Sequence, residues 1–266
     1  MIALMAALPR WALMWLLAGA IFAACKLLTW WPHRRKAGAA RSMGYLFLWP
    51  GMDARAFLDP ALRPAAPRAL DWVFATAKTL FGIALLAFAP QGPPLVRGWV
   101  GLAGMIFVLH FGTFHLVALL WKRFGVQAEP IMRAPILARS LGDFWGHRWN
   151  RGFHNLAHDH LYQRLAPKAG RAAAVMAVFL ASGLVHDLVI SVPAGGGYGL
   201  PSAYFALQGL GVLIECSAAG KDFGLGHGIA GRIFMAAFTA GPAYALFHPP
   251  FVREVIIPFM ADLGIA

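Results

Sequence analysis

The feature that most constrains this chain is a series of long apolar runs separated by turns and basic segments. Six of them approach the roughly 20 residues that an α-helix needs to cross a bilayer. They lie at about residues 11–31, 70–89, 98–121, 171–192, 200–217 and 229–247. The sequence therefore predicts an all-α polytopic membrane protein, with about six to eight transmembrane helices plus interfacial or re-entrant helices.

Composition supports this class. Hydrophobic residues make up 59% of the chain and charged residues only 13%, against roughly 25% charged residues in ordinary soluble domains. No polar linker divides the sequence, so we expect one membrane-embedded domain over residues 1–266. The segment Met1–Trp31 has only Arg10 before its apolar run and no clear cleavage site after it. We interpret this segment as a retained first helix rather than a signal peptide.

The distribution of basic residues predicts an orientation. Lys and Arg number 23 against 11 Asp and Glu, a net charge of +12. Most lie in the loops after the first and third runs, which should therefore face the cytoplasm. The segment around Asn150 then lies on the cytoplasmic side, and the Ala- and Arg-rich composition favours a bacterial inner membrane. The excess charge would also attract an anionic substrate, whereas its scatter over several loops does not favour nucleic-acid binding.

Two apolar segments are harder to place. The segment Tyr45–Asp53 is too short to span a bilayer, so we expect it to be interfacial or re-entrant. The final run, Phe251–Ala266, is either a seventh span or an interfacial segment. Neither Cys25 nor Cys216 belongs to a disulfide framework or a metal-type motif.

The most informative polar stretch lies between the third and fourth runs. On a helix over Leu141–His160, polar residues recur every three or four positions and apolar residues line the other side. The polar stripe is Asp143, His147, Arg151, His154 and His158; the apolar stripe is Leu141, Trp145, Trp149, Phe153 and Leu156. This pattern predicts a helix lying in the membrane interface. It fits a plain surface helix, or one in which Asn150, at the edge between stripes, contacts a bound carbonyl group.

A histidine inside an apolar run is the second candidate. Ionisable residues within spans are costly and usually functional, so His186 is expected to be a general base, which a neutral imidazole suits near neutral pH. The alternative is a histidine bonded to a neighbouring backbone. Asp187 is a weak candidate for orienting the ring, because adjacent helical residues point about 100° apart. Ser182 lies one turn earlier on the same face, without the motif that marks a serine nucleophile.

Other polar residues carry weaker expectations. We expect packing or pore lining for His110 and His115, and an ion pair with Lys221 or an arginine for Glu215. A tunnel lining is open to Tyr198, Tyr204 and Gln208. A solvated or interfacial position is expected for His227 and His248.

Two motifs resemble one family. The segment Asp143–Asn150, Asp-Phe-Trp-Gly-His-Arg-Trp-Asn, is similar to the aromatic-Trp-Gly-Arg-Arg-Trp-Asn pattern of the wax synthase-like branch of the membrane-bound O-acyltransferase family, with His147 in place of the first arginine. The segment Ser182–His186 matches that family's second mark, a span histidine after Ser-Gly. The likeness is densest from Pro130 to Gly211 and weaker over Trp49–Asp53.

The resemblance implies an acyl-CoA-dependent transfer to a hydroxyl acceptor, such as a long-chain alcohol in wax ester synthesis. It implies that His186 is the base and that Asn150 positions the donor or the acceptor. Acyl-CoA is then a co-substrate, and no metal or other cofactor is needed. The anionic head would be bound by arginines such as Arg139 and Arg164. The substrate-binding set is Asp143, Trp145, His147, Arg148, Trp149, Arg151 and Ser182. The chain is shorter than most family members, with fewer spans.

Two other functional classes remain open, besides an inert acyltransferase-like binding protein. A membrane di-iron lipid oxidase would use histidine boxes, and His154 and His158 have HxxxH spacing with His160 nearby, but no HxxHH occurs. A transporter or channel would use a polar path through the membrane, for which His110, His115, His186 and Asp187 are candidates. Internal symmetry, typical of transporters, is absent from the sequence.

Overall fold

The computed structural model describes residues 8–89 and 92–265. Residues 1–7, 90, 91 and 266 lie outside this description; they are the ends of the predicted domain and part of the turn after the second run. The described residues are helical with no strand, which confirms the all-α prediction. Five helical stretches are long and apolar enough to cross a membrane, and a sixth apolar helix is shorter. The chain is therefore a multi-pass membrane protein.

The helices are α2 (Arg10–Trp30), α3 (Ala39–Leu48), α4 (Ala54–Leu58), α5 (Ala69–Phe88), α6 (Pro94–Ile106), α7 (Phe114–Arg123), α8 (Leu141–Asp143), α9 (Arg151–Ala157), α10 (Gln163–Ala169), α11 (Arg171–His186), α12 (Val192–Ala194), α13 (Leu200–Cys216), α14 (Ala218–Asp222), α15 (Gly228–Ala240), α16 (Ala243–Leu246), α17 (Pro249–Phe251) and α18 (Ile257–Asp262). Five π-helical turns interrupt or extend them: η3 (Phe107–Thr113), η5 (Phe144–Arg148), η6 (His158–Tyr162), η7 (Asp187–Ser191) and η8 (Val252–Ile256). Such turns often occur at functional sites.

The predicted spans agree with the observed helices to within a few residues, because Gly and Pro mark their ends. Pro94 is the first residue of α6. Gly170, with φ 84°, precedes α11, and Gly195, with φ 67°, follows α12. These positive φ values suit a residue without a Cβ.

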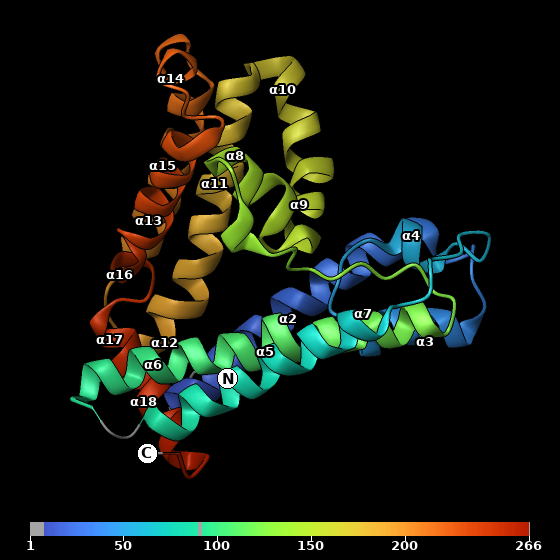
Figure 1. The fold of residues 1–266 in the computed structure, drawn as a ribbon, viewed down its shortest axis with the longest axis horizontal. Coiled ribbons are helices and arrows are strands. Elements are labelled where there is room, and N and C mark those ends of the chain that lie inside the picture. Colours follow the sequence, from blue (N-terminus) through green and yellow to red (C-terminus); the bar gives the residue numbers. More distant parts are fainter. Residues whose placement is uncertain (1–7, 90–91, 266) are drawn as a thin grey trace.

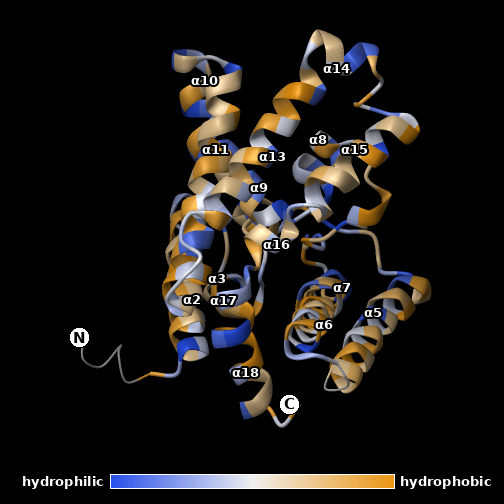
Figure 2. Cartoon of the chain, turned by 90° about the vertical axis from the view of Figure 1, so that its left-hand side faces the viewer, coloured by the Kyte–Doolittle hydropathy of each residue, from blue (hydrophilic) through white to orange (hydrophobic). Residues whose placement is uncertain are grey.

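The long helices form two groups (Figure 1). Helices α11, α13 and α15 stand beside one another, with α11 packed on α13. Helix α5 packs along α6 and η3, and this pair runs across one end of the first group. Hydrophobic residues cover most of the length of these helices, and hydrophilic residues concentrate at turns such as those near α10 and α14 (Figure 2). Helices α8 and α9 lie between the two groups.

The two short apolar segments each bury one side in the core. Tyr45 and Trp49, at the end of α3, are 0% and 4% exposed, whereas Phe47 and Leu48 between them are 72% and 65% exposed. The final run is not among the five helices long and apolar enough to cross a membrane, and one side of it packs on the protein. Its Met260 is fully buried, and a Cβ at Gly101 of α6 would stand 2.2 Å from the Met260 sulfur. Gly101 therefore allows α18 to pack tightly against α6.

Candidate active site

The polar segment is two short helices rather than one. Turn η5 ends at Arg148, Trp149 is extended with φ −91° and ψ 126°, and Asn150 is left-handed with φ 40° and ψ 56°. Helix α9 then begins at Arg151. The prediction of one continuous helix over Leu141–His160 is therefore wrong. Asparagine tolerates the left-handed region better than most residues, so the residue expected to contact substrate also makes the bend.

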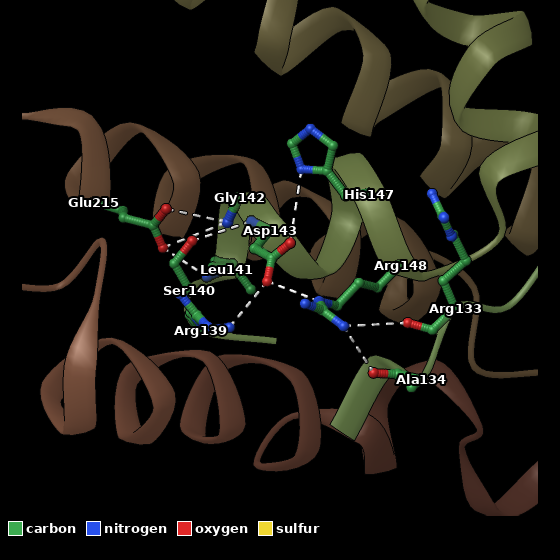
Figure 3. A network of polar contacts seen from close by, with 10 residues as sticks. All are labelled: Arg133, Ala134, Arg139, Ser140, Leu141, Gly142, Asp143, His147, Arg148 and Glu215. Atoms are coloured by element: carbon green, nitrogen blue, oxygen red, sulfur yellow. Dashed lines mark hydrogen bonds and ion pairs between the residues drawn. The ribbon is translucent and has the colours of Figure 1, made fainter. Parts of the chain in front are cut away.

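Arg148 ties the first of these helices to the preceding loop (Figure 3). Its Nε donates to Asp143 Oδ2 at 2.7 Å, and its Nη1 donates to the carbonyl oxygens of Arg133 and Ala134, both at 3.4 Å. The backbone N–H of Arg139 donates to the same Asp143 oxygen at 3.1 Å. The Arg148 guanidinium is thus engaged within the protein.

The environment of Asp143 stabilises its charged form. Partial burial disfavours the carboxylate, but the hydrogen bonds from Arg148 and Arg139 outweigh it and hold the pKa of Asp143 below its usual range. His147 contributes little to this cluster, because its side chain is 80% exposed and stands 3.7 Å from Asp143. Figure 3 shows the His147 ring joined by a single dashed line to Asp143 and to no other residue drawn.

Glu215 fixes the start of the same segment from the neighbouring span. Its carboxylate accepts hydrogen bonds from the backbone N–H groups of Leu141, at 2.6 Å, and Gly142, at 3.1 Å (Figure 3). Free N–H groups at a helix start attract a carboxylate. The expected ion pair with Lys221 or an arginine is wrong, since no salt bridge to Glu215 exists among the described residues.

Trp145 joins the polar segment to the spans. Its ring centroid lies 5.7 Å from that of Phe205 in α13 and 5.8 Å from that of Phe179 in α11. Trp149 stacks on Phe144 at 5.3 Å and lies 6.1 Å from Phe111 of η3. Trp145, Phe179 and Phe205 therefore form an aromatic cluster where the segment meets α11 and α13.

His186 is held in one tautomer by its own helix. Its Nδ1 lies 2.7 Å from the carbonyl oxygen of Ser182. A carbonyl only accepts, so Nδ1 carries the proton and Nε2 carries the lone pair. The imidazole packs on Phe205 at 4.4 Å between centroids. The Ser182 hydroxyl donates to the Val178 carbonyl at 3.0 Å, so it does not form a nucleophile pair with His186.

Asp187 serves a different cluster. Its Oδ1 accepts from the hydroxyl of Ser191, at 2.8 Å, and from the backbone of Gly199, at 2.9 Å. Its Oδ2 accepts from the backbone N–H of Ser202, at 3.0 Å, and from the Ser202 hydroxyl. These bonds confirm the expectation that Asp187 is poorly placed to orient His186. His248, 3.1 Å from the Ser191 oxygen, is fully buried, so its predicted solvated or interfacial position is wrong.

A pocket of about 340 Å³ opens between the polar segment and the spans. One wall carries a stack of polar rings: His154 on His158 with centroids 6.0 Å apart, then Tyr162 at 5.3 Å. Burial and the nearby charges of His158, His147 and Arg151 lower the pKa of His154, favouring its neutral form. The remaining lining is Gly142, Trp145, Gly146, Val175, Val178, Phe179 and Val212.

The structure brings only part of the predicted site together. Trp145 reaches His186 through Phe205, which contacts both rings. Asn150 donates its backbone N–H to the Met132 sulfur at 3.3 Å, and within the described residues no hydrogen bond joins its side-chain amide to another group. No hydrogen bond or ion pair among them links Asn150 or Arg151 to His186.

Three residues of α13 matter here, and sequence reasoning missed them or misjudged their partners. Phe205 gave no signal, since a phenylalanine in a span is unremarkable. Gln208 was expected to line a tunnel with Tyr204, but it is fully buried and bonded to Trp145. Glu215 stood out as a charge in an apolar run, but its partners lie more than 70 residues away in the chain.

The remaining histidines form no metal-type cluster. His115 is hydrogen-bonded to Lys78 at 2.7 Å, and His154 and His158 stack as described. Across the described part of the chain, no group of three or more His, Cys, Asp or Glu side chains is placed to hold one metal ion. The di-iron alternative thus gains no support from this arrangement.

Comparison with known proteins agrees with these motifs. Residues 128–207 match the model of the membrane bound O-acyl transferase family, almost the range over which the resemblance was densest. "Probable long-chain-alcohol O-fatty-acyltransferase 8" of Arabidopsis thaliana is 26% identical over 69% of this chain and 58% of its own length. "Probable long-chain-alcohol O-fatty-acyltransferase 1" is 38% identical over 24% of this chain and 21% of its own. "Acyl-CoA--sterol O-acyltransferase 1" of the same plant is 32% identical over 24% of this chain and 21% of its own.

The predicted family resemblance is thereby confirmed. The chain covers between 21% and 58% of the length of these three relatives. No solved structure gives a significant match.

Proposed function

We propose that this chain is an O-acyltransferase, because residues 128–207 match the model of the membrane bound O-acyl transferase family. The proposed donor is acyl-CoA and the proposed acceptor is the hydroxyl group of a lipid, with a long-chain alcohol as the first candidate. Long-chain alcohols and a sterol appear in the names of the matched relatives, which supports a lipidic acceptor.

The observation that carries the proposal is the tautomer of His186. Its Nδ1–H is committed to the Ser182 carbonyl, so the lone pair on Nε2 is available to a substrate. In the proposed step, Nε2 takes the hydroxyl proton while the alcohol oxygen bonds to the thioester carbon. The C–S bond then breaks, the ester leaves, and the thiolate of CoA receives the proton from the imidazolium. Base catalysis of this kind contributes about 10²–10⁴-fold.

The surroundings of His186 suit this step. Phe205 packs on His186 and Trp145 packs on Phe205, and apolar walls that exclude water help to align reactants. The pocket lined by Trp145 and Phe179, of which His186 is not a lining residue, has polar rings on one wall and apolar residues on the other, a combination that suits an amphiphilic substrate. In this proposal the free amide of Asn150 positions the donor or acceptor, and the segment faces the cytoplasm of a bacterial inner membrane, where acyl-CoA is supplied.

The test is ester formation in membranes that contain the protein, labelled acyl-CoA and alcohols of increasing length. His186→Gln keeps a donor for the Ser182 carbonyl but has no basic nitrogen, so we expect ester formation to fall to background while the protein remains folded. His227→Ala is the matched control, because the exposed His227 also contacts a backbone carbonyl, that of Gly224 at 3.1 Å. Wild-type turnover in His186→Gln would show that His186 is not the base.

Asn150 needs a paired test because it has two candidate roles. Asn150→Gly keeps the left-handed backbone, whereas Asn150→Ala strains it. If the amide contacts substrate, both variants lose most of their activity. Full activity in Asn150→Gly would assign Asn150 to the bend alone.

A further inference from the structure

One face of α13 contacts four separate parts of the candidate site. Phe205, Gln208, Val212 and Glu215 follow at spacings of three, four and three residues, so they share one side of the helix. Phe205 packs on His186, Gln208 bonds to Trp145, Val212 lines the pocket and Glu215 bonds to the start of α8. We call these four residues the α13 face.

Gln208 fixes Trp145 from both ends of its amide. Its Oε1 accepts from the indole Nε1 of Trp145 at 3.2 Å, and its Nε2 donates to the carbonyl oxygen of Phe238 in α15 at 2.6 Å. The side chain is fully buried. A buried amide is costly unless it is bonded, and here both ends have partners. The indole of Trp145 is thereby tied to α13 and, through it, to α15.

Glu215 makes the second attachment about two helical turns further along α13. Its carboxylate binds the N–H groups of Leu141 and Gly142 and is 7% exposed. The polar segment is thus held at its first residue and at Trp145. Phe205, about one turn before Gln208 on the same helix, packs on His186.

We propose that Gln208 and Glu215 are positioning residues for acyl transfer. The α13 face sets the distance between the polar segment and His186, because Gln208 and Glu215 bind the polar segment and Phe205 packs on His186. This inference rests on the proposed acyltransferase activity. A loss of alignment lowers kcat, because displacements of about 1 Å from the reactive geometry cost up to about 10²-fold, and it leaves the KM for substrate less affected.

A double-mutant cycle tests the Gln208 link. Gln208→Met removes the bond at similar volume, and Trp145→Phe removes it from the other partner. We expect each to lower kcat about tenfold or more, with KM changed less than about threefold, and the double variant to be little worse than the poorer single variant. Multiplying effects, or a change confined to KM, would overturn the proposal for Gln208.

Glu215 is tested with a graded pair. Glu215→Gln keeps one oxygen acceptor and Glu215→Ala keeps none, so kcat should fall in that order. The control is Glu254→Ala, a half-exposed glutamate paired with Arg10 at 3.5 Å, which should match the wild type. An equal loss in Glu215→Gln, Glu215→Ala and Glu254→Ala would overturn the role.

Hydrogen exchange separates this inference from the proposed function. The amides of Leu141 and Gly142 should exchange faster in Glu215→Ala than in the wild-type protein, with or without turnover. If the wild type forms no ester, the proposed function fails, and exchange still reports whether Glu215 holds the segment. Unchanged exchange at both amides would overturn the anchoring.

Discussion

His186, the last residue of α11, and Asp187, the first residue of η7, are both ionisable residues in an apolar run, but their surroundings differ. His186 faces Phe205 and the aromatic cluster, which we call the base face. Asp187 faces Ser191, Ser202 and His248, which we call the anchor face. His186 makes one hydrogen bond, to its own helix, whereas Asp187 accepts four from three residues.

This difference teaches how to separate chemistry from support in a membrane span. Both residues are costly inside an apolar helix, and cost alone would assign both to function. The carboxylate of Asp187 has its hydrogen-bonding capacity filled by the loop after α12 and by α13, so it joins those elements. The imidazole of His186 keeps one nitrogen without a partner in the described structure, so it can serve a substrate.

The largest expected effects come from one variant on each face, the first lowering turnover and the second lowering stability. His186→Gln should remove about 10²–10⁴-fold of turnover with the unfolding temperature nearly unchanged. Asp187→Asn should lower the free energy of unfolding by about 2 kcal/mol, because hydrogen bonds to a charged group are worth about 1.5–3 kcal/mol, and the folded fraction should stay active. Thermal unfolding in detergent and ester formation per folded molecule measure the two effects. Inactive but stable Asp187→Asn protein would break the comparison.

A smaller effect tests the contact between α11 and α13 that serves both faces. A Cβ at Gly183 would stand 2.7 Å from the Cα of Ser202 and 3.3 Å from the Cβ of Phe205. Gly183→Ala should therefore push the helices apart, cost about 1–3 kcal/mol and reduce turnover. Gly19→Ala in α2 is the control, since its Cβ would meet nothing within 4 Å. Equal stability of the two variants would show that the close approach is dispensable.

The span pattern was readable because it depends on local properties. Apolar run length and Gly or Pro punctuation predicted six spans; five of them are long and apolar enough to cross a membrane in the described structure, and the sixth, α13, is a shorter apolar helix. The packing of the last run could not be predicted from the sequence, because it depends on the contact of Met260 with Gly101, 159 positions away. The helix over Leu141–His160 was predicted from periodicity, which does not register a single left-handed residue at Asn150 or a π turn.

The site was readable where chemistry shows in one residue. An imidazole in a span identified His186, and the helical angle between neighbours limited the role of Asp187. The partners were not readable: Glu215 bonds to backbone N–H groups, which every sequence has, and the ring of Phe205 has no polar signal. The burial of His248 depends on its bond with Ser191, 57 residues away.

A pH effect on stability is expected from His248 on the anchor face. Burial lowers the pKa of His248, against the opposing charge of Asp187, and its Nδ1 accepts the N–H of Phe251 at 3.2 Å. Because the unfolded chain binds the proton more readily, this stability is present above about pH 6.5 and is lost as the pH falls below it. His248→Gln keeps an acceptor and a donor but does not titrate.

The measurement is thermal unfolding from pH 8 to pH 5. Relative to the wild type, His248→Gln should lose less stability on acidification, by at most about 1.4 kcal/mol per pH unit. The pKa of His154 is also lowered, and His154 is present in both proteins. The difference between their pH profiles therefore reports on His248. Parallel pH profiles would show that His248 does not contribute.

The smallest effect is expected from Ser182→Ala. The group that holds His186 is the Ser182 carbonyl, which alanine retains, and the Ser182 hydroxyl bonds to Val178 within its own helix. Turnover should therefore stay within about twofold of the wild type, although the resemblance assigned Ser182 to substrate binding. A loss of turnover approaching that of His186→Gln would show that the Ser182 hydroxyl takes part in the reaction, and the base face would then contain two reacting groups instead of one.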